Sequence, residues 1–339
     1  MKCAAIVLAG SRGAPGALCI ANGVANKTLI PVGGKPMLER VIEALLSCDR
    51  IGEILISMDR AELALALPQI AAWSAAGRVR LIQAAGTPGE SVLAAIDEAD
   101  VAWPLLVTTA DHPLLREEMI SHLLDHAPED GDATAAVVEE SVIQAAYPET
   151  VRTYLRFRDV AFSGANLFLL QSPNAKGVVL FWRHVEANRK RPLRLMMTLG
   201  FGTLLRFVTG RLDLAYALEA LGRRCGARLA VVRLPYAQAA IDVDKPADLA
   251  LVSRILTQRN SFYDSTCWFN HKRNCSELLD RPASGRRGSG FFLLCGQPAH
   301  KGFGARHVGG AIHLAPAQPL DGYRSDRAKI IFRQPVHSG

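Results

Sequence analysis

Short apolar runs rich in β-branched residues recur through the first third of the chain and limit what it can fold into. Each run is bounded by polar residues, Gly or Pro, which is typical of a strand buried on both faces of a sheet. The runs span residues 3–9, 53–58, 79–83 and 104–109, and a further apolar segment, "RLAVVRLPY", spans 228–236. We expect a β-strand at each of them.

Helix-like sequence separates the first two runs. In "KPMLERVIEALLSC", Pro36 stands near a helix start, and Met37, Val41 and Leu45 fall along one face. Strands that alternate with helices predict an α/β fold, with a mostly parallel central sheet and helices on both of its faces.

Composition favours a globular protein. The 339 residues are 49% hydrophobic and 21% charged, and no apolar run approaches the roughly 18 residues of a membrane-spanning helix. The opening "MKCAAIVLAG" is similar to a signal peptide, but its apolar part is short and passes directly into a glycine-rich loop. We therefore expect a buried first strand and a cytoplasmic protein.

The net charge of +7 is confined to the end of the chain. Residues 1–256 carry 27 Lys and Arg against 27 Asp and Glu, whereas 257–339 carry 12 against 5. The end segment is also rich in Gly and Pro and lacks periodicity, so we predict a main domain at 1–256 and an irregular, weakly ordered C-terminal extension at 257–339. No specific nucleic-acid partner is expected.

Residues 176–212 combine aromatic, basic and long apolar stretches. One interpretation is a weak contact with a membrane surface. We prefer a helical insertion, at about 176–222, that packs its Leu and Met side chains on the main domain.

The loop after the first apolar run suits a polyphosphate. Gly10, Gly13 and Gly16 permit close approach of the backbone to a ligand, and exposed amides bind oxyanions. Arg12 and Lys27 add the positive charge that such a ligand requires. The competing interpretation is an ordinary loop between a strand and a helix. The glycine spacing fits neither a dinucleotide fingerprint nor a Walker loop.

Asp111 stands two residues after the run "LLVTT", so we expect its carboxylate at the carboxyl end of a central strand. Beside a basic phosphate loop, a carboxylate there suits a hard divalent cation such as Mg²⁺. Asp242 and Asp244 alternate on an extended segment and therefore face the same side. We expect at least one of them to approach a common point with Asp111. For all three residues, helix capping is the alternative.

Four ordered segments together resemble a known family. They are "LAGSRG" with "NKTLIPVGGKPMLERVIEAL", then "AGTPGESVLAAI", "LLVTTADHPLL" and "AIDVDKPADLALV". They are similar to the nucleotidyltransferases with a glycosyltransferase-A-like (GT-A-like) fold, particularly the group typified by molybdenum-cofactor nucleotidyltransferases. The chain departs from the family pattern at two points. Ser11 replaces the usual second glycine, and 16 residues separate Gly10 from Lys27.

The resemblance implies roles for single residues on the nucleotide side. Backbone groups of the first loop would wrap the base and phosphates, and Arg12 and Lys27 would neutralise the triphosphate and the incoming phosphate. The implied nucleotide-binding residues are Leu8, Ala9, Gly10, Ser11, Arg12, Lys27, Gly86 and Ser91.

On the metal and acceptor side, the resemblance implies that Asp111 holds Mg²⁺ (or Mn²⁺), with Asp242 or Asp244 as the second ligand. Asp244 is slightly preferred, because it matches the family's Asp-x-Pro. Asn166, in "SGANLFLL", would contact the acceptor. Arg12, Lys27 and Asp111 are the candidate catalytic residues.

These expectations describe a magnesium-dependent enzyme that transfers a nucleoside monophosphate from an NTP to a phosphorylated small-molecule acceptor and releases pyrophosphate. Three alternatives stay open: a molybdenum-cofactor guanylyl- or cytidylyltransferase, an inactive nucleotide-binding protein on the same fold, and a nucleotide-sugar glycosyltransferase. The last would release a nucleoside diphosphate in place of pyrophosphate.

Overall fold

The computed structural model describes residues 2–11, 16–98, 101–188 and 200–259. All of them belong to the first of two compact units, which spans 1–280; the second unit, 281–339, lies outside the described residues. Most of the predicted extension at 257–339, together with Arg12 and Gly13, therefore also lies outside them.

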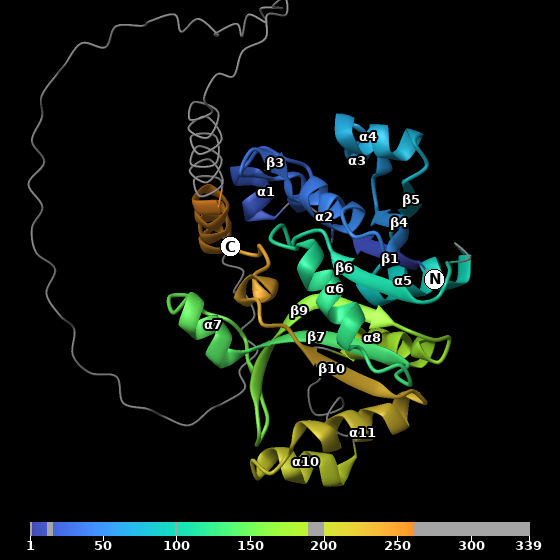
Figure 1. Ribbon diagram of the computed structural model, residues 1–339, viewed down its shortest axis with the longest axis vertical. Helices are drawn as coiled ribbons and strands as arrows, with labels where there is room; N and C mark the ends of the chain where they lie inside the picture. Colours follow the sequence, from blue (N-terminus) through green and yellow to red (C-terminus); the bar gives the residue numbers. More distant parts are fainter. Residues whose placement is uncertain (1, 12–15, 99–100, 189–199, 260–339) are drawn as a thin grey trace, which may run out of the picture. The chain divides into compact units, whose positions relative to one another are not determined.

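Helices and strands alternate along the described chain (Figure 1). The strands are β1 Cys3–Leu8, β2 Pro31–Val32, β3 Lys35–Pro36, β4 Ile51–Met58, β5 Val79–Gln83, β6 Leu105–Thr109, β7 Ala133–Glu139, β8 Leu155–Arg156, β9 Ala161–Leu170 and β10 Leu229–Arg233. The α-helices are α1 Ala17–Ala21, α2 Met37–Leu46, α3 Ala61–Leu65, α4 Pro68–Ala75, α5 Pro88–Glu98, α6 Glu117–His126, α7 Glu140–Ala146, α8 Ala175–Asn188, α10 Phe201–Val208 and α11 Leu214–Cys225. Short 3₁₀ turns are η1 Lys27–Leu29 and η2 Ala237–Ala240, and residues 246–259 are also helical.

The central sheet has eight strands in the order β10-β7-β9-β6-β1-β4-β5, with β8 paired to β9 beside this path. β1 pairs in parallel with both β4 and β6, β4 with β5, and β7 with β10. Only β9 interrupts the pattern among the main strands, because it runs antiparallel to its neighbours β6 and β7. The sheet is mostly parallel, as the sequence predicts.

Helices cover both faces of this sheet, because the strands are apolar on both sides. Along β1, Ala5 and Val7 point into a core shared with α2 and α6. Ala4 and Ile6, one residue out of phase, point into a second core shared with α5 and α8. This alternation is the period-two pattern of a buried strand.

Four of the strands predicted from apolar runs are present within two residues of their expected ends, as β1, β4, β5 and β6, and β10 lies within the fifth segment. No strand was expected at β7, whose "ATAAVVE" is rich in alanine and lacks a long apolar run. The predicted helix after Pro36 is α2, with Pro36 at its N-cap. The segment 176–222 contains α8, α10 and most of α11.

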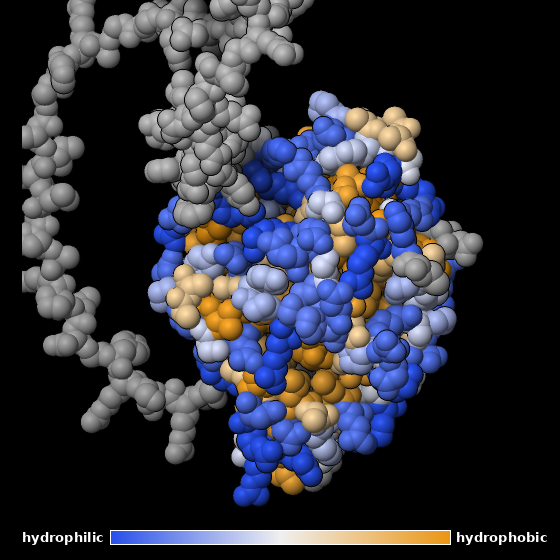
Figure 2. All heavy atoms as spheres, viewed as in Figure 1, coloured by the Kyte–Doolittle hydropathy of each residue, from blue (hydrophilic) through white to orange (hydrophobic). Residues whose placement is uncertain are grey.

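Apolar side chains also reach the surface. On the face shown in Figure 2, several gather where β10 and α11 lie in Figure 1. In α10, Leu205 and Val208 are exposed. Within the described part of the chain, no helix is both long and apolar enough to cross a membrane.

We expect the core under α2 to dominate stability. Leu45→Ala removes a fully buried side chain between α2 and the sheet, so the free energy of unfolding should fall by about 2–5 kcal/mol. Chemical denaturation measures this change. The matched control is Leu65→Ala, because Leu65 is exposed in α3 and its loss should cost less than about 1 kcal/mol.

Candidate active site

The candidate active site lies at the carboxyl edge of the parallel strands. The glycine loop follows β1, Asp59 follows β4, the loop with Gly86 follows β5, and Asp111 follows β6. Because these strands pair in parallel, the loops that follow them meet at one edge of the sheet.

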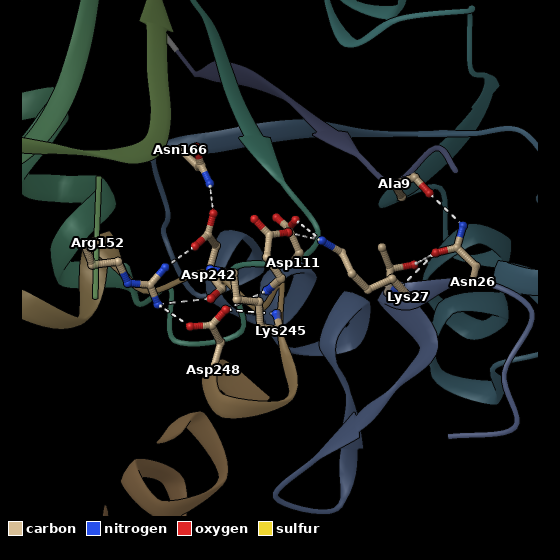
Figure 3. Close-up of polar contacts among 11 residues, drawn as sticks. Ala9, Asn26, Lys27, Asp111, Arg152, Asn166, Asp242, Lys245 and Asp248 are labelled. Carbon is tan, nitrogen blue, oxygen red and sulfur yellow. Dashed lines mark hydrogen bonds and ion pairs between the residues drawn. The ribbon is translucent and has the colours of Figure 1, made fainter. Parts of the chain in front are cut away.

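Asn26 fixes the position of Lys27 in this edge. Its side-chain oxygen accepts hydrogen bonds from the amide and the hydroxyl of Thr28, both at 2.9 Å, and so caps η1. Its amide nitrogen donates to the carbonyl oxygen of Ala9 at 3.0 Å. This buried side chain therefore ties the turn that carries Lys27 to the loop after β1 (Figure 3).

Lys27 joins two carboxylates that come from distant parts of the chain. Its Nζ lies 2.7 Å from Asp111 Oδ2 and 2.7 Å from Asp244 Oδ1. Burial lowers the pKa of Lys27, but the charges and hydrogen bonds of Asp111 and Asp244 outweigh it, so that the pKa is raised well above its usual value. The ammonium group is therefore charged whenever the protein is folded at neutral pH.

Asp111 holds the closing segment of the domain as well as Lys27. Its carbonyl oxygen accepts a hydrogen bond of 2.9 Å from the backbone N–H of Val243. Its side-chain Oδ1 is buried and has no hydrogen-bond partner within the described residues. Helix α6 begins at Glu117 with Arg116 at its N-cap, so the capping alternative for Asp111 is wrong.

A third carboxylate, that of Asp248, caps the helix at 246–259. Its Oδ2 accepts from the backbone N–H groups of Asp244 at 3.1 Å and Lys245 at 2.9 Å. A side chain that reaches back to the first amides in this way forms half of a capping box. The cap therefore comes from Asp248, and the capping alternative for Asp242 and Asp244 is wrong.

Asp242 lies near Asp111 and Asp244 but has different hydrogen-bond partners. Its Oδ1 accepts from Arg152 Nη1 at 2.5 Å, and its Oδ2 accepts from Asn166 Nδ2 at 3.1 Å (Figure 3). Burial raises its pKa, and the charges of Asp244 and Asp111 raise it further, against the lowering effect of Arg152. The three carboxylates of Asp111, Asp242 and Asp244 thus lie close enough to repel one another.

A β-bulge explains how Asn166 reaches Asp242 from the middle of β9. The pairing of β7 with β9 shifts between Ala135 and Val137, because their partners on β9 are Phe168 and Gly164. Asn166 lies within this irregular stretch and has a left-handed backbone, with φ of 48°. A bulge bends a strand and redirects a side chain, which here points to the site.

The residues expected to bind the nucleotide make protein contacts of their own. The amide and hydroxyl of Ser11 both donate to Asp59, at 2.9 Å and 2.6 Å, and these bonds lower the pKa of Asp59 although burial raises it. Ser91 Oγ accepts from the amide of Ala85 at 3.0 Å. Ser11 and Ser91 therefore shape the loops after β1 and β5.

Two glycines allow these loops to lie close to their neighbours. A Cβ on Gly10 would lie 3.2 Å from the Cβ of Ala84, and one on Gly86 would lie 2.9 Å from Glu90 Oε2. Leu8 and Ala9 lead into the same loop from β1. Their contacts with a nucleotide stay a prediction, as do those of Arg12, which lies outside the described residues.

The sequence profile of the MobA-like NTP transferase domain matches residues 5–191. This chain belongs to that family. Members of the MobA-like family are nucleotidyltransferases, so the chain is an enzyme of this type with an NTP as its substrate. Nucleotidyl transfer is supported over the glycosyltransferase alternative.

Solved structures agree with the family assignment in fold. A hypothetical transferase from Thermus thermophilus is 32% identical, with a TM-score of 0.62, and the match covers 74% of this chain and 100% of that one. The expected GT-A-like nucleotidyltransferase fold is confirmed. No curated protein matches the chain significantly.

Two further structures match at lower similarity. One is a 4-diphosphocytidyl-2C-methyl-D-erythritol synthase from Anaerococcus prevotii, 14% identical over 76% of this chain and 98% of that one, with a TM-score of 0.47. The other is a CMP:2-keto-3-deoxy-manno-octonic acid synthetase solved with CTP, 17% identical over 76% and 100%, with a TM-score of 0.44.

Four residues that build the site of this MobA-like chain are not among those predicted from its sequence: Asn26, Asp59, Arg152 and Asp248. Two of them carry a signal, because Asn26 directly precedes Lys27 and Asp59 directly follows an apolar strand, much as Asp111 stands two residues after one. Arg152 stands in an irregular segment between α7 and β8 with no motif around it. Its partners are brought to it only by the fold.

We expect the stability of this enzyme to depend on pH through His112, next to Asp111. The side chain is 1% exposed, and burial lowers its pKa to about 4. Between pH 6.5 and 4 the unfolded chain takes up a proton that the folded chain does not. The free energy of unfolding should therefore be highest above pH 6.5 and should fall by up to about 3 kcal/mol as the pH is lowered towards 4.

Urea unfolding of the wild type and of His112→Gln at pH 7, 5.5 and 4.5 tests this expectation. The variant should show a flatter dependence on pH, because glutamine does not titrate. His126→Gln is the matched control, since His126 is exposed at the end of α6. Equal slopes for the wild type and His112→Gln would contradict the assignment.

Proposed function

We propose that this enzyme transfers a nucleoside monophosphate from an NTP to a phosphorylated small-molecule acceptor, with Mg²⁺ (or Mn²⁺), and releases pyrophosphate. The observation that carries the proposal is the meeting of Asp111, Asp244 and Lys27 at the carboxyl edge of the sheet. Two carboxylates and one ammonium group from different segments serve no capping or core function there.

The residues at this point fit a magnesium ion. Asp111 Oδ1 is a buried oxygen without a partner among the described residues, and an unpaired buried acceptor is costly unless a ligand satisfies it. The described residues contain no group of three or more His, Cys, Asp or Glu arranged for a metal. Two carboxylates suit Mg²⁺, which in such sites takes its other ligands from phosphate oxygens and water.

In this proposal Asp111 and Asp244 hold the metal, and Lys27 donates hydrogen bonds to the phosphates of the NTP. When bound, the metal neutralises negative charge that the triphosphate carries and develops. The ammonium group of Lys27 would stabilise the same negative charge. Asn26 fixes the turn that carries Lys27, so this group is in place before the substrate arrives. No protein nucleophile is needed, because an acceptor phosphate is already ionised at neutral pH.

The identity of the acceptor stays open between a general phosphorylated metabolite and the molybdenum cofactor. Asn166 stays a predicted acceptor contact; its amide nitrogen donates to Asp242. The membrane contact predicted for 176–212 also stays a prediction: α10 exposes Leu205 and Val208, whereas 189–199 lie outside the described residues. The same holds for the cytoplasmic location.

A screen tests the proposal directly. Each of the four common NTPs is incubated with Mg²⁺ and pooled phosphorylated metabolites, and both pyrophosphate and nucleoside diphosphate are measured. Pyrophosphate with one NTP is the expected result. Release of nucleoside diphosphate alone would overturn the proposal in favour of a glycosyltransferase.

Asp111→Asn should abolish pyrophosphate release, because it removes the charge of a metal-holding carboxylate while keeping its shape. The matched control is Asp125→Asn, because Asp125 pairs with Arg50 on the surface. Turnover of the control should equal that of the wild type, and circular dichroism should show both variants folded. Near-normal turnover of Asp111→Asn would remove the role proposed for this residue.

Lys27→Met should lower kcat by about 10² to 10³, or about 3–4 kcal/mol of barrier, the usual effect of losing one preorganised donor. Lys35→Met is its control, since Lys35 pairs with Glu43 on the exposed side of α2. Steady-state kinetics measures both. A change in melting temperature with unchanged kcat would assign Lys27 a purely structural role.

A further inference from the structure

Arg152 is a buried cation that no motif in the sequence marks. Its side chain is 9% exposed. Its guanidinium group contacts Asp242 Oδ1 at 2.5 Å, the carbonyl oxygen of Asp242 at 3.3 Å and Asp248 Oδ1 at 3.2 Å (Figure 3). A planar guanidinium can bond several acceptors at fixed angles, which a lysine cannot do.

These contacts act on the segment that carries Asp244. While Asp248 Oδ1 is held by Arg152, its Oδ2 accepts from the backbone N–H groups of Asp244 and Lys245. One carboxylate therefore connects the guanidinium to the main chain of Asp244 itself. On the other side, the N–H of Val243 donates to the carbonyl oxygen of Asp111. Every residue from 242 to 245 is thus fixed by a named hydrogen bond.

Each of the two cations at the site pairs with a different pair of carboxylates. Lys27 pairs with Asp111 and Asp244, whereas Arg152 pairs with Asp242 and Asp248. Both oxygens of Asp242 already accept from protein groups, one from Arg152 and one from Asn166. The bulge in β9 that directs Asn166 to Asp242 supports the same arrangement.

We propose that Arg152 is a positioning residue that clamps the closing segment through Asp242 and Asp248, so that Asp244 faces Asp111, and that Asp242 is a partner of this clamp and no ligand of the metal. The proposal rests on the proposed function, because it assigns Asp244 to the metal. It gives separate roles to two aspartates that are both candidate metal ligands in the sequence, where only the family resemblance prefers Asp244.

Loss of the clamp has a specific consequence. Without Arg152, the carboxylates of Asp242 and Asp248 are poorly solvated and have lost the cation that pairs with both of them. Because they then repel each other, the segment between them should shift so that they move apart. Metal binding and kcat should then suffer together. The KM for NTP at saturating Mg²⁺ should change little, because Arg152 contacts no nucleotide-binding residue among those described.

Equilibrium binding of Mn²⁺ tests the proposal without relying on turnover. Electron paramagnetic resonance measures free Mn²⁺ in the presence of inorganic tripolyphosphate, which stands in for the NTP phosphates. Arg152→Met should weaken Mn²⁺ binding at least tenfold, and Arg152→Lys should recover part of the loss. Arg156→Met is the matched control, because Arg156 pairs with Glu140 on the surface and should bind as the wild type does.

The two aspartates provide the second comparison. Asp242→Asn keeps the shape and one acceptor oxygen but loses the second acceptor and the charge that pairs with Arg152. It should therefore weaken Mn²⁺ binding through the clamp, by no more than Arg152→Met does, whereas Asp244→Asn should abolish it. Equal losses for these two variants would overturn the assignment of Asp242. If Arg152→Met does not fold, wild-type binding and kcat in a folded Arg152→Lys would overturn the clamp.

Kinetics with the NTP found in the screen completes the test. Folded Arg152→Met should show kcat reduced at least tenfold and KM within twofold. Wild-type values for both constants and for Mn²⁺ binding would overturn the clamp while leaving the proposed function intact. A wild-type protein that neither binds Mn²⁺ nor releases pyrophosphate would instead overturn the proposed function itself.

Discussion

The structure of the site depends on one ammonium group between two carboxylates. Asp111 leaves the central strand β6, and Asp244 stands far along the chain, just before the helix at 246–259. Like charges brought this close repel each other. Lys27 removes that repulsion, with 2.7 Å to each carboxylate. The closing segment can therefore return to the sheet edge with Asp244 beside Asp111.

The rest of the edge holds this arrangement in place through main-chain contacts. Asn26 fastens the turn of Lys27 to the carbonyl of Ala9, and the carbonyl of Asp111 accepts from Val243. The carboxylate of Asp248 fixes the backbone amides of Asp244 and Lys245. A buried side chain with all its hydrogen bonds satisfied is rigid, and rigidity lets a charged group act before the substrate arrives.

Features of this molecule that depend on residues close together in the sequence can be predicted from it. Features that depend on residues far apart in the sequence cannot. The strands β1, β4, β5 and β6 are predictable because each is a local apolar run between polar residues. Asp111 is found because it stands two residues after the end of β6. The strand β7 is missed because its alanines give a weak signal. The insertion of β9 between β6 and β7, and the meeting of Arg152 with Asp242 across 90 positions, depend on tertiary packing alone. The capping alternative for Asp111 failed because Arg116 stands at the N-cap of α6. It failed for Asp242 and Asp244 because their side chains accept from Arg152, Asn166 and Lys27.

The bridge made by Lys27 also bears on the order in which partners can enter. Its ammonium group already balances the charge of Asp111 and Asp244, so a bare divalent ion has to compete with a cation that is covalently part of the protein. A nucleotide that arrives with its metal offers phosphate oxygens to the same ammonium, and the exchange then leaves no charge unpaired. In a metal-dependent transfer, the lysine would act as an internal competitor, and the site would select the metal–nucleotide complex over the free ion.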